Sequence, residues 1–179
     1  MIKKLENINQ ILHDMNNILF SISGMILLGK KHEAQLKLEK IFGEISNVDK
    51  NLSPVDYLFN AKIKIAEKYK IDFQIDKNII FPKIDDSELC IIFGNILDNA
   101  IESCVKLKLK NRFIKFQFDK LNGKYIYNIS NSTKLSKFSK DNFHEHMGLE
   151  ITKGLIIKNN GNLNLSVNKK IFTICITFP

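Results

Sequence analysis

A change of pattern at Ser53-Pro54 constrains the fold of this 179-residue chain more than any other feature. Before it, apolar residues recur every three or four positions, which is the spacing of amphipathic helices. After it, helical patterns alternate with short runs in which apolar and polar residues alternate, as they do in strands. Proline ends an incoming helix and is favoured in the first turn of the next one. We therefore predict two domains, residues 1–52 and 53–179.

The first domain is predicted to be a helical hairpin. Its first helix covers residues 3–28, and the second follows the connector at residues 29–32 and carries apolar residues from Leu38 to Val48. Two helices joined by a short link lie antiparallel, and such a pair cannot bury both of its apolar faces alone. We therefore expect a homodimer in which two hairpins form a four-helix bundle.

The second domain is predicted to be a two-layer α/β sandwich, with helices on one face of a mixed sheet. The whole chain is thus of the α+β class. The expected helices span residues 55–68, 86–107 and 147–159, and the expected strands span residues 71–75, 112–119, 124–131, 162–167 and 171–178. Asn122-Gly123 favours a hairpin turn, Asn160-Gly161 is a usual helix stop, and the last two strands are expected to pair. The polar residues 132–145 are expected to form a loop.

Composition restricts the location and the partners. The net charge is +8, but the 27 basic residues are scattered, and Arg112 is the single arginine. We therefore expect no nucleic-acid partner, and steering of an anionic ligand is an equally good use of the charge. The three cysteines lack the spacing of a metal site and suit a reducing compartment. Without a signal peptide or an apolar run of about 20 residues, we expect a cytoplasmic protein with no membrane insertion.

Two asparagines on the expected helix 86–107 have the geometry of a ligand site. Asn95 and Asn99 are four residues apart, so they project from the same helix face about one turn apart. A carboxamide oxygen is a suitable ligand for Mg²⁺, and Asp98 and Glu102 add negative charge nearby. Taken alone, the pattern also fits an exposed helix face that is solvated by polar side chains.

Residues 93–104 read FGNILDNAIESC. This string closely resembles the N box of sensor histidine kinases of the GHKL ATPase superfamily, above all the subgroup of accessory-gene-regulator and citrate/fumarate-type sensors. The resemblance implies a Bergerat-type ATP-binding domain with ATP and Mg²⁺ as cofactors. It implies that Asn99 binds the metal and that Asn95 holds the metal-bound phosphate or its water. Asp98 and Glu102 belong to the same expected ATP site.

The segment from His146 to Ile151 resembles the glycine box of the same family. A glycine at a helix N-terminus lets backbone N–H groups approach a phosphate closely. Gly148 and the following Leu149 are kept here, whereas His146 replaces the first glycine and is assigned a phosphate contact.

The family's aspartate loop, which reads adenine, is missing from this chain. Asn131, at the end of the expected strand 124–131, is its best substitute. An asparagine can accept a hydrogen bond from the adenine amino group, although without the charge of a carboxylate.

The pattern His13-Asp14-x-x-Asn17 resembles the phosphoacceptor helix of this kinase subgroup. In that reading, a neutral His13 nitrogen attacks the γ-phosphate of ATP. Asp14 orients the ring and takes the proton from its other nitrogen. Asn17, one turn further on, positions a water or the acyl phosphate of a partner.

The predicted function is that of a histidine kinase that phosphorylates itself on His13 and transfers the phosphoryl group to an aspartate of a response regulator. A separate sensor protein, or a longer chain of which this is a fragment, would supply the signal. One alternative is a histidine phosphotransferase resembling sporulation initiation phosphotransferase B, which relays phosphate without ATP. A second is a dimeric module that only binds a regulator. An anti-sigma serine kinase would share the ATP fold but would not need the histidine pattern.

Overall fold

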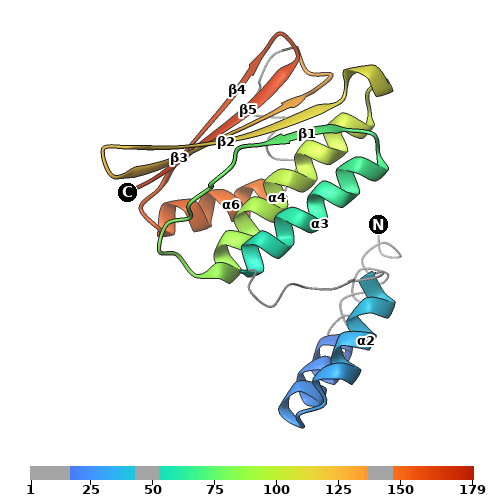
Figure 1. Cartoon of the computed structure of the whole chain (residues 1–179). Coiled ribbons are helices and arrows are strands. Elements are labelled where there is room, and N and C mark those ends of the chain that lie inside the picture. The colour runs from blue at the N-terminus through green and yellow to red at the C-terminus, as the bar shows by residue number, and fades with distance from the viewer. Residues whose placement is uncertain (1–16, 43–52, 137–146) are drawn as a thin grey trace, which may run out of the picture. The chain divides into compact units, whose positions relative to one another are not determined.

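The computed structural model describes residues 17–42, 53–136 and 147–179. The chain divides into two compact units, Met1–Lys50 and Asn51–Pro179. Helices alone make up the described part of the first unit, and the second unit combines helices with a sheet (Figure 1). The predicted α+β class is therefore confirmed.

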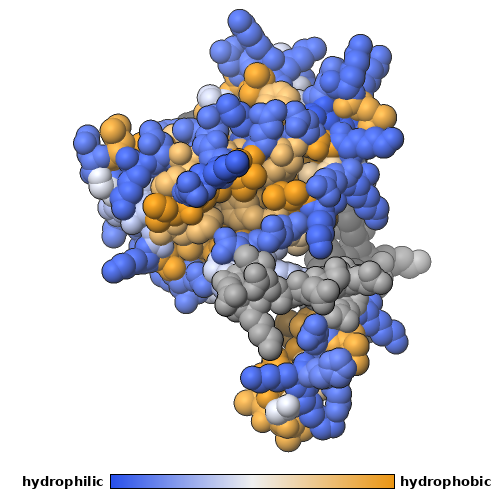
Figure 2. Space-filling view, viewed as in Figure 1, coloured by the Kyte–Doolittle hydropathy of each residue, from blue (hydrophilic) through white to orange (hydrophobic). Residues whose placement is uncertain are grey.

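The described part of the first unit contains segments of both predicted helices. Residues 17–27 are helical, α2 spans Lys31–Phe42, and Gly29 links them at a φ of 72°. Ile22 and Ala34 are buried, and the Lys37 ammonium of α2 donates a hydrogen bond to Ser21 Oγ of the preceding helix. Several large apolar side chains stay exposed on this unit (Figure 2), namely Leu19, Phe20, Ile26, Leu27, Leu28 and Leu36.

The second unit is the predicted two-layer sandwich (Figure 1). Its helices α3 (Pro54–Lys68), α4 (Asp86–Val105) and α6 (Met147–Lys158) lie on one face of a five-stranded sheet. The strands are β1 (Asp72–Ile75), β2 (Phe113–Leu121), β3 (Lys124–Ser132), β4 (Asn162–Asn168) and β5 (Ile171–Phe178), in the order β1-β2-β3-β5-β4. β1 is parallel to β2 and the other neighbours are antiparallel, so the sheet is mixed, as predicted. The short 3-10 helix η1 (Leu109–Asn111) was not predicted.

Ser53-Pro54 begins α3 through a capping box. The Ser53 hydroxyl accepts a hydrogen bond from the Asp56 N–H, and the Asp56 carboxylate accepts one from the Ser53 N–H. Pro54 occupies the first turn, where its missing N–H costs nothing. α4 begins in a similar way, because Asp85 accepts a hydrogen bond from the Ser87 N–H at 2.8 Å. The change of sequence pattern at Ser53-Pro54 therefore coincides with a well-capped helix start.

The end of α6 differs from the usual glycine stop. Asn160 is the residue in the left-handed conformation, with a φ of 56°, and the Gly161 N–H bonds to the Ile156 carbonyl at 2.8 Å. Gly161 is needed for space, because a Cβ there would lie 2.7 Å from the Phe178 ring and 2.9 Å from the Ile156 side chain. Asn160-Gly161 therefore ends the helix as predicted, but Asn160 takes the left-handed conformation and Gly161 provides space for the neighbouring side chains.

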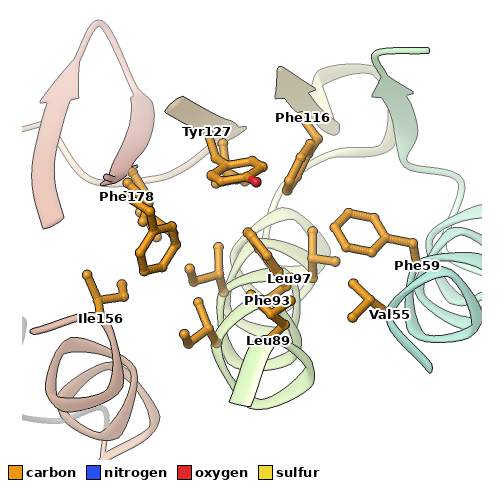
Figure 3. Packing of buried hydrophobic residues seen from close by; sticks show 14 of the residues in the cluster. Val55, Phe59, Leu89, Phe93, Leu97, Phe116, Tyr127, Ile156 and Phe178 are labelled. Atoms are coloured by element: carbon orange, nitrogen blue, oxygen red, sulfur yellow. The ribbon is translucent and has the colours of Figure 1, made fainter. Parts of the chain in front are cut away.

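An aromatic core joins α4 to the sheet (Figure 3). The Phe93 ring lies 5.2 Å from that of Tyr127 and 5.6 Å from that of Phe116, and Phe59 of α3 closes the group at 4.9 Å from Phe116. The Tyr127 hydroxyl donates to the Ile80 carbonyl at 2.6 Å, and burial raises the pKa of this phenol. Fully buried α4 residues contact both the sheet and the neighbouring helices, so α4 is the centre of the core.

Arg112 joins the C-terminal ends of two helices to the start of β2. Its guanidinium donates to the Val105 and Leu107 carbonyls at 2.9 Å, just where α4 ends, and to the Tyr69 carbonyl beyond α3 at 2.8 Å. The last carbonyls of a helix have no partner within the helix. The single arginine therefore satisfies acceptors that would otherwise depend on water.

We predict that Arg112→Lys lowers the free energy of unfolding by about 2 kcal/mol, because an ammonium cannot reach the separated carbonyls that the planar fork joins. Urea denaturation of the two proteins measures the difference. Lys108→Ala removes an exposed cation from the same segment and should change stability little. A lysine variant as stable as the wild type would contradict this assignment.

Glu88 in the first turn of α4 joins the end of α6. Its carboxylate accepts hydrogen bonds from the Lys158 ammonium and, at 2.7 Å, from the Asn159 amide. The bond from Lys158, followed by that from Asn159, lowers the pKa of Glu88 below its ordinary value of 4.5. The same pairing raises the pKa of Lys158.

The stabilisation from Glu88 is predicted to depend on pH. Because its folded-state pKa lies below the unfolded value, the contribution is complete above pH 4.5 and is lost as the pH falls through the folded-state pKa. Glu88→Gln should therefore lower the urea midpoint at pH 7, and the gap to the wild type should narrow in acid. Glu67→Gln, at an exposed position of α3, serves as the control. A gap that stays constant with pH would argue against the pairing.

Candidate nucleotide site

The burial of α4 fixes which of its side chains point away from the core. Its apolar face is buried along the whole helix, from Leu89 to Cys104. Asn95 and Asn99 are half-buried beside that face, and Asp98 and Glu102 are exposed. The helix therefore places the two asparagines where its buried face meets its surface.

Asn95 is bound to the first turns of α6. Its Nδ2 donates to the Gly148 carbonyl at 3.1 Å and to Thr152 Oγ1 at 3.2 Å. A carbonyl oxygen can only accept, so the amide nitrogen must face α6 and Oδ1 is left as the acceptor end of the side chain. The N box and the glycine box, 53 residues apart, thus meet at this contact.

Gly148 allows that contact because it has no side chain. A Cβ at this position would lie 3.3 Å from both Cγ and Oδ1 of Asn95. Leu149 is only 4% exposed and belongs to the core, so it packs under the start of α6. The glycine therefore brings the α6 backbone close to Asn95, and the leucine holds the helix end in place.

Asp98 has its partner on α3. Asp98 accepts a hydrogen bond from the Lys62 ammonium of α3 at 2.6 Å, and the Lys62 side chain is 14% exposed. The structure therefore joins Asp98 to α3, away from the contact between Asn95 and α6. The side chains of Glu102 and Asn99 make no hydrogen bond with another described residue.

Asn131 lies at the end of β3 on the face that the helices cover. Buried Tyr127 and Ile129 lie four and two residues before it, so all three side chains are on the same face of the strand. Asn131 is only 2% exposed. Its Nδ2 donates to the Ser132 carbonyl at 2.9 Å, which fixes the orientation of the amide. Oδ1 is again the acceptor end, as an interaction with an adenine amino group would require.

Three of the predicted site residues lie outside the described residues, namely His13, Asp14 and His146. Asn17 is exposed at the first described position of its helix. Among the described residues, no group of three or more His, Cys, Asp or Glu side chains could hold a metal ion. The carboxamide oxygens of Asn95 and Asn99 are hard neutral ligands that fit Mg²⁺, with phosphate oxygens and waters as its further ligands.

The comparison with family models matches the GHKL domain over residues 84–179. This chain belongs to the GHKL family. The matched segment contains Asn95, Asn99, Asn131 and Gly148, so the predicted GHKL fold is confirmed. The comparison with curated proteins gives no match.

Solved structures share the GHKL fold at low sequence identity. The catalytic domain of the histidine kinase ThkA has 17% identity and a TM-score of 0.58, covering 70% of this chain and 90% of that domain. The mycobacterial sensor histidine kinase MprB has 16% identity and a TM-score of 0.56, covering 70% and 93%. The histidine kinase AdeS of Acinetobacter baumannii has 16% identity and a TM-score of 0.59, covering 99% and 82%. At these identities the likeness shows the fold.

Two polar residues of the second unit, Thr152 and Lys62, were not singled out from the sequence. Thr152 is fully buried and bonds to Asn95, and Lys62 pairs with Asp98. Thr152 follows Gly148 by four residues, so one helix face carries both; that spacing was the available signal. Lys62 gave no such signal, because lysines are frequent throughout the chain. No described helix of this GHKL chain is both long and apolar enough to cross a bilayer.

Two glycines of α6 give a matched pair of variants. Gly154 has nothing within 4 Å of an added Cβ, so Gly154→Ala should stabilise the protein by about 0.5–1 kcal/mol through its better helix propensity. Gly148→Ala should lose this gain, because its methyl group must displace the Asn95 amide. Thermal or urea unfolding measures both effects. Equal stabilisation by the two substitutions would show that the Asn95 side chain can move away from an added methyl group without loss of stability.

Proposed function

We propose that this GHKL protein is a histidine kinase that binds ATP with Mg²⁺, phosphorylates itself on His13 and passes the phosphoryl group to a response-regulator aspartate. The contact between Asn95 and Gly148 is the observation that carries the proposal. It joins the face of α4 that carries the Asn95 and Asn99 carboxamides, which suit Mg²⁺, to the N-terminal end of α6. At a helix N-terminus, N–H groups without a partner in the helix and the helix dipole favour an anion. A nucleotide–metal complex combines both kinds of ligand.

In the proposed site, Asn99 offers its oxygen to the metal and the first turn of α6 approaches the phosphates. When bound, Mg²⁺ neutralises charge on the β- and γ-phosphates. Asn131 accepts a hydrogen bond from the adenine amino group through Oδ1, because the bond from its Nδ2 to the Ser132 carbonyl fixes the orientation of the amide. Glu102 is exposed one turn beyond Asp98 and adds negative charge beside the metal.

The proposed transfer has two steps. A lone pair of the His13 imidazole attacks the γ-phosphorus, the bond to the β–γ bridging oxygen breaks, and ADP leaves. Asp14 takes the proton from the other ring nitrogen. The carboxylate of the regulator then attacks the same phosphorus, the P–N bond breaks, and His13 is released as it takes the proton back from Asp14, with Asn17 beside the reacting groups. These roles follow from the sequence resemblance.

The proposed partners are a second copy of the chain, a response regulator and a separate sensor protein. The exposed apolar residues of the hairpin, including Leu19, Phe20 and Leu27, support pairing of two hairpins into a four-helix bundle. All three cysteines are free, which suits the reducing cytoplasm in which we place the protein.

A phosphotransferase that does not use ATP is the second candidate. Asn131 in place of a carboxylate favours this candidate, since a neutral amide binds adenine more weakly than a charged acceptor. Such a protein would need His13 but not Asn99.

We predict that incubation of the purified full chain with γ-³²P-ATP and Mg²⁺ gives label that is stable in base and lost in acid, as expected for phosphohistidine. His13→Ala should remove the label completely, and Asn99→Ala should reduce it at least about tenfold. His32→Ala, which changes a histidine of the first unit that is assigned no role, should leave the label unchanged.

Other outcomes separate the candidates. Transfer from a phosphorylated regulator that needs His13 but not ATP would favour the phosphotransferase. Label that survives His13→Ala would disprove the assigned acceptor. A protein with neither activity would leave only the regulator-binding module.

A further inference from the structure

Asn95 has used both of its donor hydrogens inside the protein. One is donated to the Gly148 carbonyl and the other to Thr152 Oγ1. A primary amide has two N–H donors on one nitrogen, so no donor is left for a ligand. The orientation cannot be reversed at low cost, because a reversed amide would place Oδ1 against the Gly148 carbonyl, and both of these atoms are acceptors.

Thr152 is the second anchor of this amide. Its side chain is fully buried, and the other buried residues of α6, Leu149 and Ile156, are apolar. Gly148 provides the first anchor and also the space, since a Cβ there would meet the amide at 3.3 Å. The two residues lie one turn apart on α6, so they hold the amide at two points and restrict its rotation.

We infer that Thr152 is a positioning residue that, together with Gly148, makes Asn95 an acceptor-only ligand of the nucleotide-bound Mg²⁺ or of its water. A phosphate oxygen is itself an acceptor, so Asn95 cannot bind it by a hydrogen bond from the locked amide. The inference rests on the proposed function, and it narrows the role of Asn95 from phosphate or water to metal or metal-bound water.

Loss of the Thr152 hydroxyl should therefore affect the metal more than the nucleotide. In Thr152→Val, a side chain of nearly the same shape leaves one amide hydrogen of Asn95 without a partner, and Oδ1 is no longer held in one place. Thr152→Ser keeps the acceptor and loses only a methyl group. The valine and serine variants therefore separate the hydroxyl from the packing.

The test uses the full chain and a fluorescent trinitrophenyl analogue of ATP. Its dissociation constant is measured in EDTA and then during a Mg²⁺ titration, while thermal unfolding confirms that each variant is folded. Thr152→Val should raise the Mg²⁺ concentration for half-maximal tightening about five- to tenfold, as expected for one lost hydrogen bond, and change the metal-free affinity less than about twofold. Thr152→Ser should resemble the wild type.

Asn95→Asp gives a second, independent test. Aspartate is the better Mg²⁺ ligand in isolation, but it cannot donate to Gly148 or Thr152. We expect it to weaken the response to Mg²⁺, and tighter Mg²⁺ binding would overturn the inference.

The remaining outcomes are equally decisive. An unchanged Mg²⁺ response in Thr152→Val, an equal loss with and without metal, or a serine variant that behaves like valine would overturn the positioning role and leave the proposed kinase intact. A wild-type protein that binds no nucleotide would overturn both this role and the proposed use of ATP.

Discussion

The burial of α4 between the sheet and its two neighbouring helices is the constraint on which the rest of the second unit depends. Phe93 packs against the rings of Tyr127 and Phe116, while α3 and α6 cover the sides of the helix. A helix enclosed on three sides cannot rotate without exposing large apolar side chains, at about 1.5–3 kcal/mol for each. The polar side chains of α4 therefore have fixed neighbours, and Asn95 meets α6 for this reason.

Polar contacts at three levels then hold α4 to the elements around it. Glu88, near the start of α4, binds the end of α6, and Asn95, in the middle of α4, binds the beginning of α6. Arg112 donates hydrogen bonds to carbonyls at the end of α4. Glu88 and Asn95 contact opposite ends of α6, so they set its direction across α4 as well as its distance. The apolar core supplies most of the stability, and these contacts select one arrangement of the helices.

The periodicity of the sequence was sufficient to predict the helices, the strands and the pairing of the last two strands. It could not predict which neighbour faces a given residue, because a pattern of spacing defines a face but not what covers it. Asp98 illustrates the limit: its place in the N box predicts a place in the ATP site, but no pattern in the sequence indicates that Lys62 of α3 pairs with it. Thr152 was missed for the same reason. Asn131 was predicted from the end of its strand, and the strand alternation turns it toward the helices.

Asn95 and Asn131 of the candidate site are held in their orientations by the same kind of hydrogen bond. In each, Nδ2 donates to a backbone carbonyl, Gly148 for Asn95 and Ser132 for Asn131, and the amide oxygen is directed elsewhere. Asn95 then presents only its oxygen to a ligand, because both of its N–H groups are donated within the protein, whereas Asn131 donates one N–H and keeps the other. In the proposed site, Oδ1 of Asn131 favours adenine, because adenine presents an amino donor where guanine presents a carbonyl acceptor. Without the charge, however, the base contributes less affinity, so binding of the proposed nucleotide must depend more heavily on the phosphates and the metal.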